Sequence, residues 1–229
     1  MPRVAGSLPL ARARASAAKV ALLGDAQTGK TSMMIKFVEE RRVDDDYVQT
    51  LGVNFMEKTV PVRDTDVVFS VWEPGSQHDF KQTLPLVCSD ADAFLFMFDL
   101  GRRSTLSSVR RWYRDATANN VAATPVLVGT KYDFFCNLPA DERRETTRQA
   151  RAYAKAMGAP LVFCSARHGV NVKTLFRVVC ASVFGAPSGV AQNVDVEVGP
   201  VLVESGESGA GSSSASRAGP SSPSRQTTT

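Results

Sequence analysis

The sequence predicts an α/β fold, in which a mostly parallel six-stranded sheet carries helices on both faces. The first observation is that apolar runs of strand length alternate along the chain with segments of helical periodicity. The second is that most of these runs are apolar throughout, as expected for strands that are buried on both faces. The third is an early pair of strand-like runs separated by three residues, which predicts a hairpin and hence one antiparallel edge.

The first elements surround a glycine-bearing loop. "KVALLGD" (residues 19–25) predicts a strand that enters this loop, and "TSMMIKFVEE" (31–40) has helical spacing. "NFMEKTVPV" (54–62) and "DVVFSVW" (66–72) form the predicted hairpin, joined through "RDT" (63–65). A helix is therefore expected directly after the first loop, followed by the antiparallel pair.

The later elements repeat the alternation of strand and helix. "AFLFMFD" (93–99), "TPVLVG" (124–129) and "PLVFCSA" (160–166) predict three buried strands. "STLSSVRRWYRDA" (104–116) predicts a helix with a serine cap and an inner face formed by Leu106, Val109 and Tyr113. Another helix is marked by Ala150, Tyr153, Ala154 and Met157. The closing helix has an apolar face formed by Val172, Leu175, Phe176, Val179, Cys180 and Val183.

Composition limits the possible classes of protein. The chain has 229 residues, of which 43% are hydrophobic, so it can bury the core of one full domain. The formal charge of +4 is too small to indicate nucleic acid as a partner. Four scattered cysteines without metal-ligand spacing indicate reduced thiols in an intracellular protein. No apolar run approaches the ~18 residues of a membrane span.

We expect the domain to cover residues 17–185, with extensions on both sides. Residues 1–16 are basic and lack acids, which fits a disordered extension or, in composition, a mitochondrial presequence. Residues 186–229 are rich in Ser, Gly and Pro and are expected to be disordered. The chain ends in "QTTT", without a prenylation motif, so no direct lipid anchor is expected.

The loop after the first strand carries a phosphate-binding motif. "GDAQTGKT" fits G-x-x-x-x-G-K-[ST] between a strand and a helix, which is the context in which this P-loop motif binds phosphates. Backbone N–H groups at the start of the helix attract phosphate oxygens. Lys30 can reach the β- and γ-phosphates, and the Thr31 hydroxyl can bind Mg²⁺. The residues assigned to the phosphates are Gly24, Asp25, Ala26, Gln27, Thr28, Gly29, Lys30, Thr31 and Ser32.

Two later loops indicate guanine as the base. In "GTKYD", the Asp133 carboxylate can accept hydrogen bonds from both N1–H and the exocyclic amine of guanine, whereas adenine offers an acceptor at N1. The aliphatic stem of Lys131 can cover the base plane. "CSAR" can present backbone N–H groups to guanine O6 after the last strand. The residues assigned to the base are Thr130, Lys131, Asp133, Ser165, Ala166 and Arg167.

These motifs resemble those of the Ras-like small GTPases, from Lys19 to about Gly185. Within that superfamily, "DDDYVQTLGVNFMEKTV", "TLPLVCSDADAFLFMFDLGRRSTLSSVRRWY" and "GTKYDFF" are most similar to the fungal septum-promoting group that acts in mitotic exit. The resemblance implies a P-loop NTPase with a Ras-like G domain that binds GTP or GDP with Mg²⁺. It further implies an effector protein kinase, a two-part GTPase-activating complex and a scaffold at the spindle pole body, in the cytoplasm.

The resemblance also assigns roles within two switch segments. Thr50 matches the threonine that closes on Mg²⁺ and the γ-phosphate, and Gln77 matches the glutamine that orients the attacking water. In "WEPGSQ", Glu73 replaces an aspartate that reaches Mg²⁺ through a water, and Ser76 replaces a glycine whose N–H binds the γ-phosphate. Ala26 stands nearest the γ-phosphate, where its methyl group can crowd an incoming catalytic side chain. These departures predict slow hydrolysis that depends on an activating partner.

Other functions remain open at this stage. "TLGVNF" is compatible with a Rab-like trafficking GTPase, although the terminal cysteines of that group are absent. Glu73 and Ser76 are compatible with a nucleotide-loaded scaffold that no longer cycles. A P-loop kinase is disfavoured by Asp133 and "CSAR". Arginines near the third helix (Arg102, Arg103, Arg110, Arg111 and Arg114) predict either a solvated face or a surface for an acidic partner.

Overall fold

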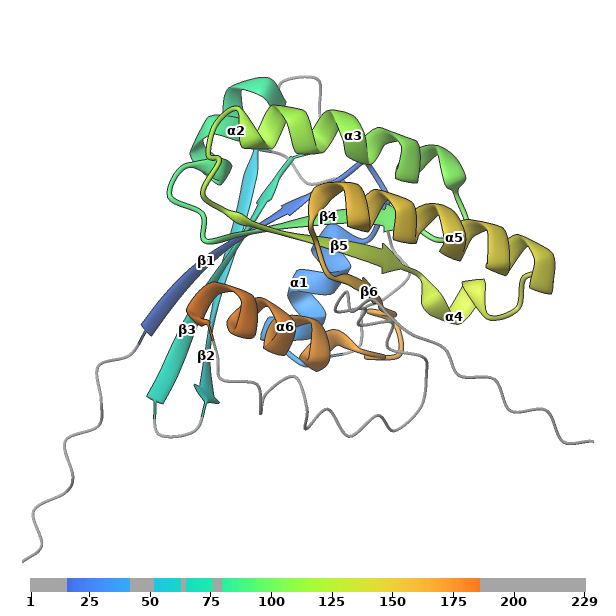
Figure 1. Ribbon diagram of the computed structural model, residues 1–229. Coiled ribbons are helices and arrows are strands. Elements are labelled where there is room, and N and C mark those ends of the chain that lie inside the picture. Colours follow the sequence, from blue (N-terminus) through green and yellow to red (C-terminus); the bar gives the residue numbers. More distant parts are fainter. Residues whose placement is uncertain (1–15, 42–51, 63–64, 76–79, 186–229) are drawn as a thin grey trace, which may run out of the picture.

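The fold is a six-stranded sheet between two layers of helices. A computed structural model describes residues 16–41, 52–62, 65–75 and 80–185, and Figure 1 shows the two helical layers on opposite faces of the sheet. The strands are β1 (Ser16–Leu23), β2 (Val53–Val62), β3 (Thr65–Pro74), β4 (Ala93–Asp99), β5 (Thr124–Thr130) and β6 (Leu161–Phe163). The helices are α1 (Lys30–Val38), α2 (Phe80–Cys88), α3 (Arg103–Thr117), α4 (Tyr132–Phe135), α5 (Ala140–Met157) and α6 (Val172–Phe184).

The sheet has the predicted topology. Its strand order is β2-β3-β1-β4-β5-β6, and only the β2–β3 pair is antiparallel. Because the other strands run parallel, their carboxyl ends meet at one edge of the sheet, where ligands of such folds bind. The prediction of a mostly parallel sheet with one antiparallel edge is confirmed.

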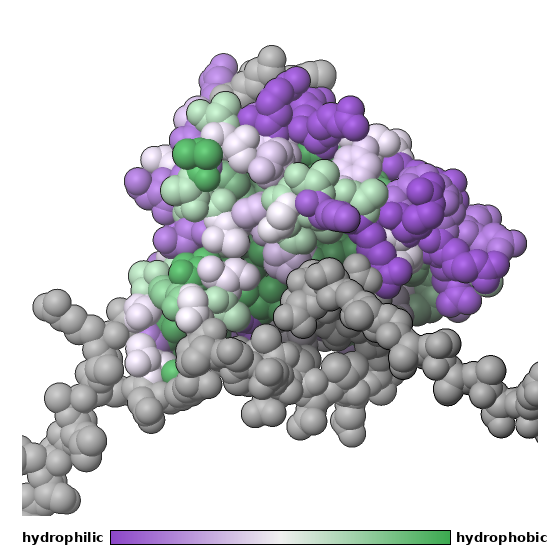
Figure 2. Space-filling model, viewed as in Figure 1, coloured by the Kyte–Doolittle hydropathy of each residue, from purple (hydrophilic) through white to green (hydrophobic). Residues whose placement is uncertain are grey.

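Two apolar cores hold the helices to the sheet. On one face, Phe37 of α1 stacks on Phe176 of α6 with ring centroids 3.4 Å apart, and Phe69 of β3 packs edge-on against both rings. On the other face, α2, α3 and α5 cover the sheet, and residues such as Leu84, Leu106 and Ala150 are buried there. Figure 2 shows that hydrophilic residues gather on the outer surface over α5, whose other face is buried against the sheet. The predicted helices α1, α3, α5 and α6 therefore turn an apolar side to the sheet, as their periodicity indicates.

Several local predictions need correction. The buried face of α3 contains Trp112 and leaves Tyr113 only partly buried. The expected serine cap is absent, because α3 begins at Arg103 and its N-cap residue, Arg102, makes no side-chain cap. β3 extends through Glu73 and Pro74, which the sequence placed in the loop after the strand. β1 begins at Ser16, one residue before the predicted domain start.

None of the helices in the described ranges combines the length and the apolar character that crossing a bilayer requires. The predicted extensions, residues 1–16 and 186–229, lie outside the described part of the chain apart from Ser16.

Candidate functional site

The three predicted loops lie at the same edge of the sheet. The phosphate loop follows β1, "GTKYD" spans the end of β5 and the start of α4, and "CSAR" follows β6. Because β1, β5 and β6 are parallel members of one sheet, their carboxyl ends bring these loops together. The spatial arrangement that a nucleotide site needs is thus a direct result of strand order.

The phosphate loop leaves β1 in close contact with β4. A Cβ atom built on Gly24 would lie 2.2 Å from the carbonyl oxygen of Met97, so no larger residue fits there without a backbone shift. Further along the loop, Ala26 and Gln27 are exposed, whereas Thr28 is fully buried. The middle of the loop is therefore exposed to solvent, whereas Gly24 and Thr28 on either side of it are buried.

Lys30 is positioned above the loop by two hydrogen bonds. Its Nζ donates to the carbonyl oxygens of Gly24 and Asp25, each at 3.0 Å. The side chain is only 5% exposed. Burial lowers the pKa of Lys30, and the nearby charges of Glu73 and Asp25 oppose this shift. The ammonium group is therefore held beside the loop that is predicted to receive phosphates.

Thr31 lies against Glu73, the departure noted in the second switch segment. The Thr31 hydroxyl is 2.9 Å from Oε1 and 2.8 Å from Oε2 of Glu73. Glu73 is 3% exposed, and burial raises its pKa. The charge of Lys30 and hydrogen bonds from Thr31 and Asn54 act in the opposite direction. A hydroxyl and a carboxylate thus meet at the start of α1.

Helix α3 fixes the outer side of the phosphate loop. The Asp25 carboxylate accepts a hydrogen bond of 2.8 Å from the indole N–H of Trp112, and Arg111 lies 3.3 Å from the same oxygen. Both donors come from α3. Asp25 is therefore engaged by the protein itself, and its side chain serves to position the loop.

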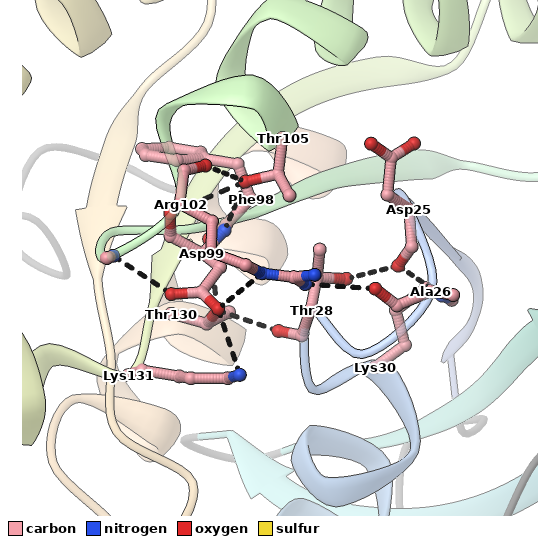
Figure 3. Close-up of polar contacts among 11 residues, drawn as sticks. Asp25, Ala26, Thr28, Lys30, Phe98, Asp99, Arg102, Thr105, Thr130 and Lys131 are labelled. Atoms are coloured by element: carbon pink, nitrogen blue, oxygen red, sulfur yellow. Dashed lines mark hydrogen bonds and ion pairs between the residues drawn. The ribbon is translucent and has the colours of Figure 1, made fainter.

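A second link joins the phosphate loop to the end of β4. Arg102 donates from Nη2 to the carbonyl oxygen of Ala26 and from Nε to Oδ2 of Asp99, both at 3.0 Å. Lys131 pairs with the same Oδ2 at 2.9 Å. Figure 3 shows these side chains converging on Asp99, which is buried. One carboxylate therefore connects the residue that supports the phosphate loop with the lysine predicted to cover the base.

The base loop also contacts the phosphate loop directly. The hydroxyl oxygen of Thr130 lies 2.7 Å from the carbonyl oxygen of Thr28 and 3.0 Å from that of Phe98 (Figure 3). Thr130 is 3% exposed. Lys131 then adopts a left-handed backbone conformation, with φ of 58°, and α4 begins at the next residue. This sharp turn places Asp133 in the first turn of α4.

Asp133 faces the loop after β6. Its Oδ2 lies 3.9 Å from Nε2 of His168, and its side chain is 27% exposed. Ser165 is buried, and its hydroxyl oxygen accepts a hydrogen bond from the His168 backbone N–H. Ala166 is partly buried and Arg167 is exposed. The carboxylate and the "CSAR" loop therefore border one partly open region.

Two of the described residues, Thr31 and Glu73, carry oxygen donors at the start of α1. Among all the residues that the structure describes, no group of three or more His, Cys, Asp or Glu residues converges. The hydroxyl of Thr31 and the carboxylate of Glu73 are hard oxygen donors, the type that Mg²⁺ takes up in combination with phosphates and water. The donor set therefore fits the magnesium ion that the sequence predicts.

Three predicted site residues cannot be placed. Thr50, Ser76 and Gln77 lie outside the described residues. Conversely, the structure adds contacts that sequence reasoning missed, made by Asn54, Asp99, Arg102, Trp112 and His168. In "FLFMFD" an acid directly follows a buried apolar run, and this pattern could have indicated that Asp99 lies at the carboxyl end of a strand, next to the site.

Comparison with known proteins identifies the family of the chain. The model of the Ras family matches residues 19–184. The chain is 52% identical to septum-promoting GTP-binding protein 1 of Schizosaccharomyces pombe over 166 residues, which cover 72% of this chain and 83% of that protein. It is 28% identical to GTP-binding protein YPTM1 of Zea mays over 173 residues, or 75% and 80% of the two chains. The chain therefore belongs to the Ras family of small GTPases, nucleotide switches that hydrolyse GTP.

Proposed function

We propose that the site at the carboxyl edge of the sheet binds GTP and GDP through the predicted residues. The phosphates lie on the loop from Gly24 to Ser32, with Lys30 on the β- and γ-phosphates and Thr31 on Mg²⁺. The observation that carries the proposal is the position of Lys30, whose buried ammonium lies 3.0 Å from two carbonyl oxygens of the loop. Incoming phosphate oxygens would replace these carbonyls as partners of the same ammonium.

In this proposal the base is selected by Asp133. Its carboxylate accepts from N1–H and the amine of guanine, while Lys131 covers the ring and backbone N–H groups of Ser165, Ala166 and Arg167 receive O6. Chromatography of the nucleotide released from purified protein tests this directly. Guanine nucleotides are expected, and release of adenine nucleotides in equal amount would contradict the assignment.

Hydrolysis in this family depends on positioning and charge stabilisation rather than on covalent chemistry by the protein. We assign orientation of the attacking water to Gln77, closure on the γ-phosphate to Thr50, and a backbone N–H to Ser76. When bound, Mg²⁺ neutralises charge on the phosphates. The residues of the chain bind the nucleotide, orient the water and exclude other water from the reacting group.

We further propose that hydrolysis by the isolated chain is slow and needs an activating partner. Ala26 places an exposed methyl group on the phosphate loop, and Glu73 contacts Thr31 from the start of the second switch segment. Such a partner contributes ~10³- to 10⁵-fold in rate in related proteins. Single-turnover assays with γ-labelled GTP measure the intrinsic rate. A rate typical of an unassisted small GTPase would contradict the proposal.

The cellular role that we propose is control of septation and mitotic exit. The 52% identity to a septum-promoting GTP-binding protein supports this role. In it, the GTP form recruits an effector protein kinase, a two-part GTPase-activating complex restrains it, and a scaffold holds it at the spindle pole body. Expression in fission yeast depleted of that relative tests the role, because septum formation should return with the wild-type chain and not with Lys30→Ala.

A second candidate is a nucleotide-loaded scaffold that does not cycle. It is favoured by Glu73, which is buried and already engaged with Thr31. A switch requires an effector to bind the GTP and GDP forms with different affinities. Measuring effector affinity with GDP and with a GTP analogue separates the candidates, since equal affinities indicate the scaffold.

A further inference from the structure

We propose that Glu73 binds the magnesium ion of the bound nucleotide directly, beside Thr31, instead of through a water molecule. The proposal rests on the proposed function of this site as a guanine-nucleotide site. It concerns only how the ion is held by this chain, in which glutamate stands where the family pattern has aspartate.

The first argument is the separation of the donor atoms. Mg²⁺ binds six oxygen atoms in a nearly ideal octahedron at about 2.0–2.1 Å, so neighbouring ligand atoms are about 2.8–3.0 Å apart. Oε1 and Oε2 of Glu73 lie 2.9 and 2.8 Å from the Thr31 hydroxyl oxygen. Either carboxylate oxygen is therefore at the distance from Thr31 that two adjacent ligands of one ion require. The same distances are those of an O–H···O hydrogen bond, so only the hydroxyl hydrogen has to turn away from Glu73 for both oxygens to bind the same cation.

The second argument is that the backbone holds Glu73 in place. Glu73 pairs with Asn54 in the antiparallel register of β2 and β3, and the following residue, Pro74, pairs with Val53. The N–H of Gly75 donates to the carbonyl of Gly52. Because these contacts fix the end of β3, the length of the side chain decides how far the carboxylate reaches. An aspartate there is shorter by one C–C bond, about 1.5 Å, and leaves room for an intervening water.

The third argument concerns charge. Glu73 is 3% exposed, and a buried carboxylate is stable only when a cation or hydrogen bonds compensate it. The charge of Lys30 acts on Glu73 and favours its ionised form. When Lys30 turns to the phosphates, a divalent cation beside Thr31 restores the compensation for Glu73. Charge balance and donor geometry therefore point to the same position for the ion.

The experiment uses the full-length chain loaded with GDP and Mn²⁺ in place of Mg²⁺. Line broadening of the Mn²⁺ resonance by ¹⁷O-water counts the bound water molecules. Direct binding predicts one more water in Glu73→Asp than in the wild type, and equal counts would overturn the proposal. Glu57→Asp is the matched control, because Glu57 is an exposed glutamate of the same hairpin, and its water count should equal that of the wild type.

A second measurement uses only the wild-type protein, so it does not depend on whether the Glu73→Asp variant folds. Wild-type protein with ¹³C in its glutamate carboxyl groups should show the electron–nuclear coupling of a carboxylate bound to Mn²⁺, and absence of that coupling would overturn the proposal. Nucleotide content, measured on the same samples, keeps the two hypotheses apart. A wild-type chain that holds no guanine nucleotide refutes the proposed function, whereas a loaded chain with a water-separated Glu73 refutes only this inference.

Discussion

The guanidinium of Arg102 and the carbonyl of Ala26 are joined by a hydrogen bond of 3.0 Å, although the residues lie 76 positions apart in the chain. Arg102 also pairs with Asp99, which in turn pairs with Lys131. The phosphate loop, the end of β4 and the base loop are therefore tied by consecutive polar contacts. A nucleotide that contacts both the phosphate loop and the base loop would therefore bind to two loops whose relative position is already fixed by these contacts.

Arg102→Ala is expected to accelerate nucleotide dissociation by about tenfold. The substitution removes a hydrogen bond to Ala26 and one of the cations on the buried Asp99, and bonds to charged groups contribute about 1.5–3 kcal/mol. Partial exposure of Arg102 places the effect at the lower end of that range. Release of fluorescent GDP, chased with excess GDP, measures the rate. Arg110→Ala, on the exposed side of α3, is the control and should leave the rate unchanged.

Asp133→Asn is expected to exchange guanine for xanthine as the preferred base. Asparagine offers one acceptor and one donor in place of two acceptors. It matches the N1–H and C2 carbonyl of xanthine and meets the guanine amine with a donor. GDP affinity should fall roughly 10- to 100-fold, since a mismatched buried polar group costs about 1–3 kcal/mol, while affinity for xanthosine diphosphate rises. Competition binding checks both, and Asp141→Asn on exposed α5 should bind like the wild type.

Gly24→Ala is expected to destabilise the fold more than Gly158→Ala. At Gly158 the cost is the left-handed backbone, φ 60°, because no atom lies within 4 Å of the new methyl group, and about 1 kcal/mol is expected. At Gly24 the methyl group would overlap the carbonyl of Met97 at 2.2 Å, so β1 and β4 must separate. Urea denaturation with and without GDP measures both costs. Equal losses of stability would show that the contact with Met97 is easily relieved.

Cys136 is expected to be the thiol that reacts in the folded protein. All four cysteines are free, Cys136 is exposed, and Cys88, Cys164 and Cys180 are buried. Burial raises the pKa of Cys88 to about 12 and that of Cys164 further, so neither forms a thiolate near neutral pH. Ellman's reagent at pH 8 should titrate one thiol before denaturation and four after it. Fast reaction of a second thiol in the native chain, or any in Cys136→Ser, would contradict the burial described above.

The sequence predicted the sheet well because buried parallel strands are long apolar runs with loops between them. It missed α2, which contains Pro85, and the four-residue α4. Proline normally ends a helix, and a single turn has too few residues to show periodicity. The end of β3 was also misjudged, since Glu73 and Pro74 look like loop residues until their pairing with β2 is seen.

For the site, the phosphate and base loops could be predicted because each is a short motif with its own strand. The link from Ala26 through Arg102 and Asp99 to Lys131 could not, because it joins segments that only tertiary structure brings together. Whether the assigned residues bind a nucleotide remains a prediction for the experiments above. Thr50, Ser76 and Gln77 are in addition outside the described residues.

The pairing of β2 with β3 has a consequence for how the protein responds to nucleotide. The segment with Thr50 enters β2 and the segment with Gln77 leaves β3, and the strand ends between them are joined by the Val53–Pro74 pair and the Gly75–Gly52 hydrogen bond. The described strand ends between the two segments therefore form one backbone-bonded unit, so a displacement of one strand end is transmitted to the other. Nucleotide contacts made by Thr50 and by Gln77 would therefore act on the same strand pair, and the response of the hairpin end to nucleotide should be a single cooperative transition rather than two independent ones.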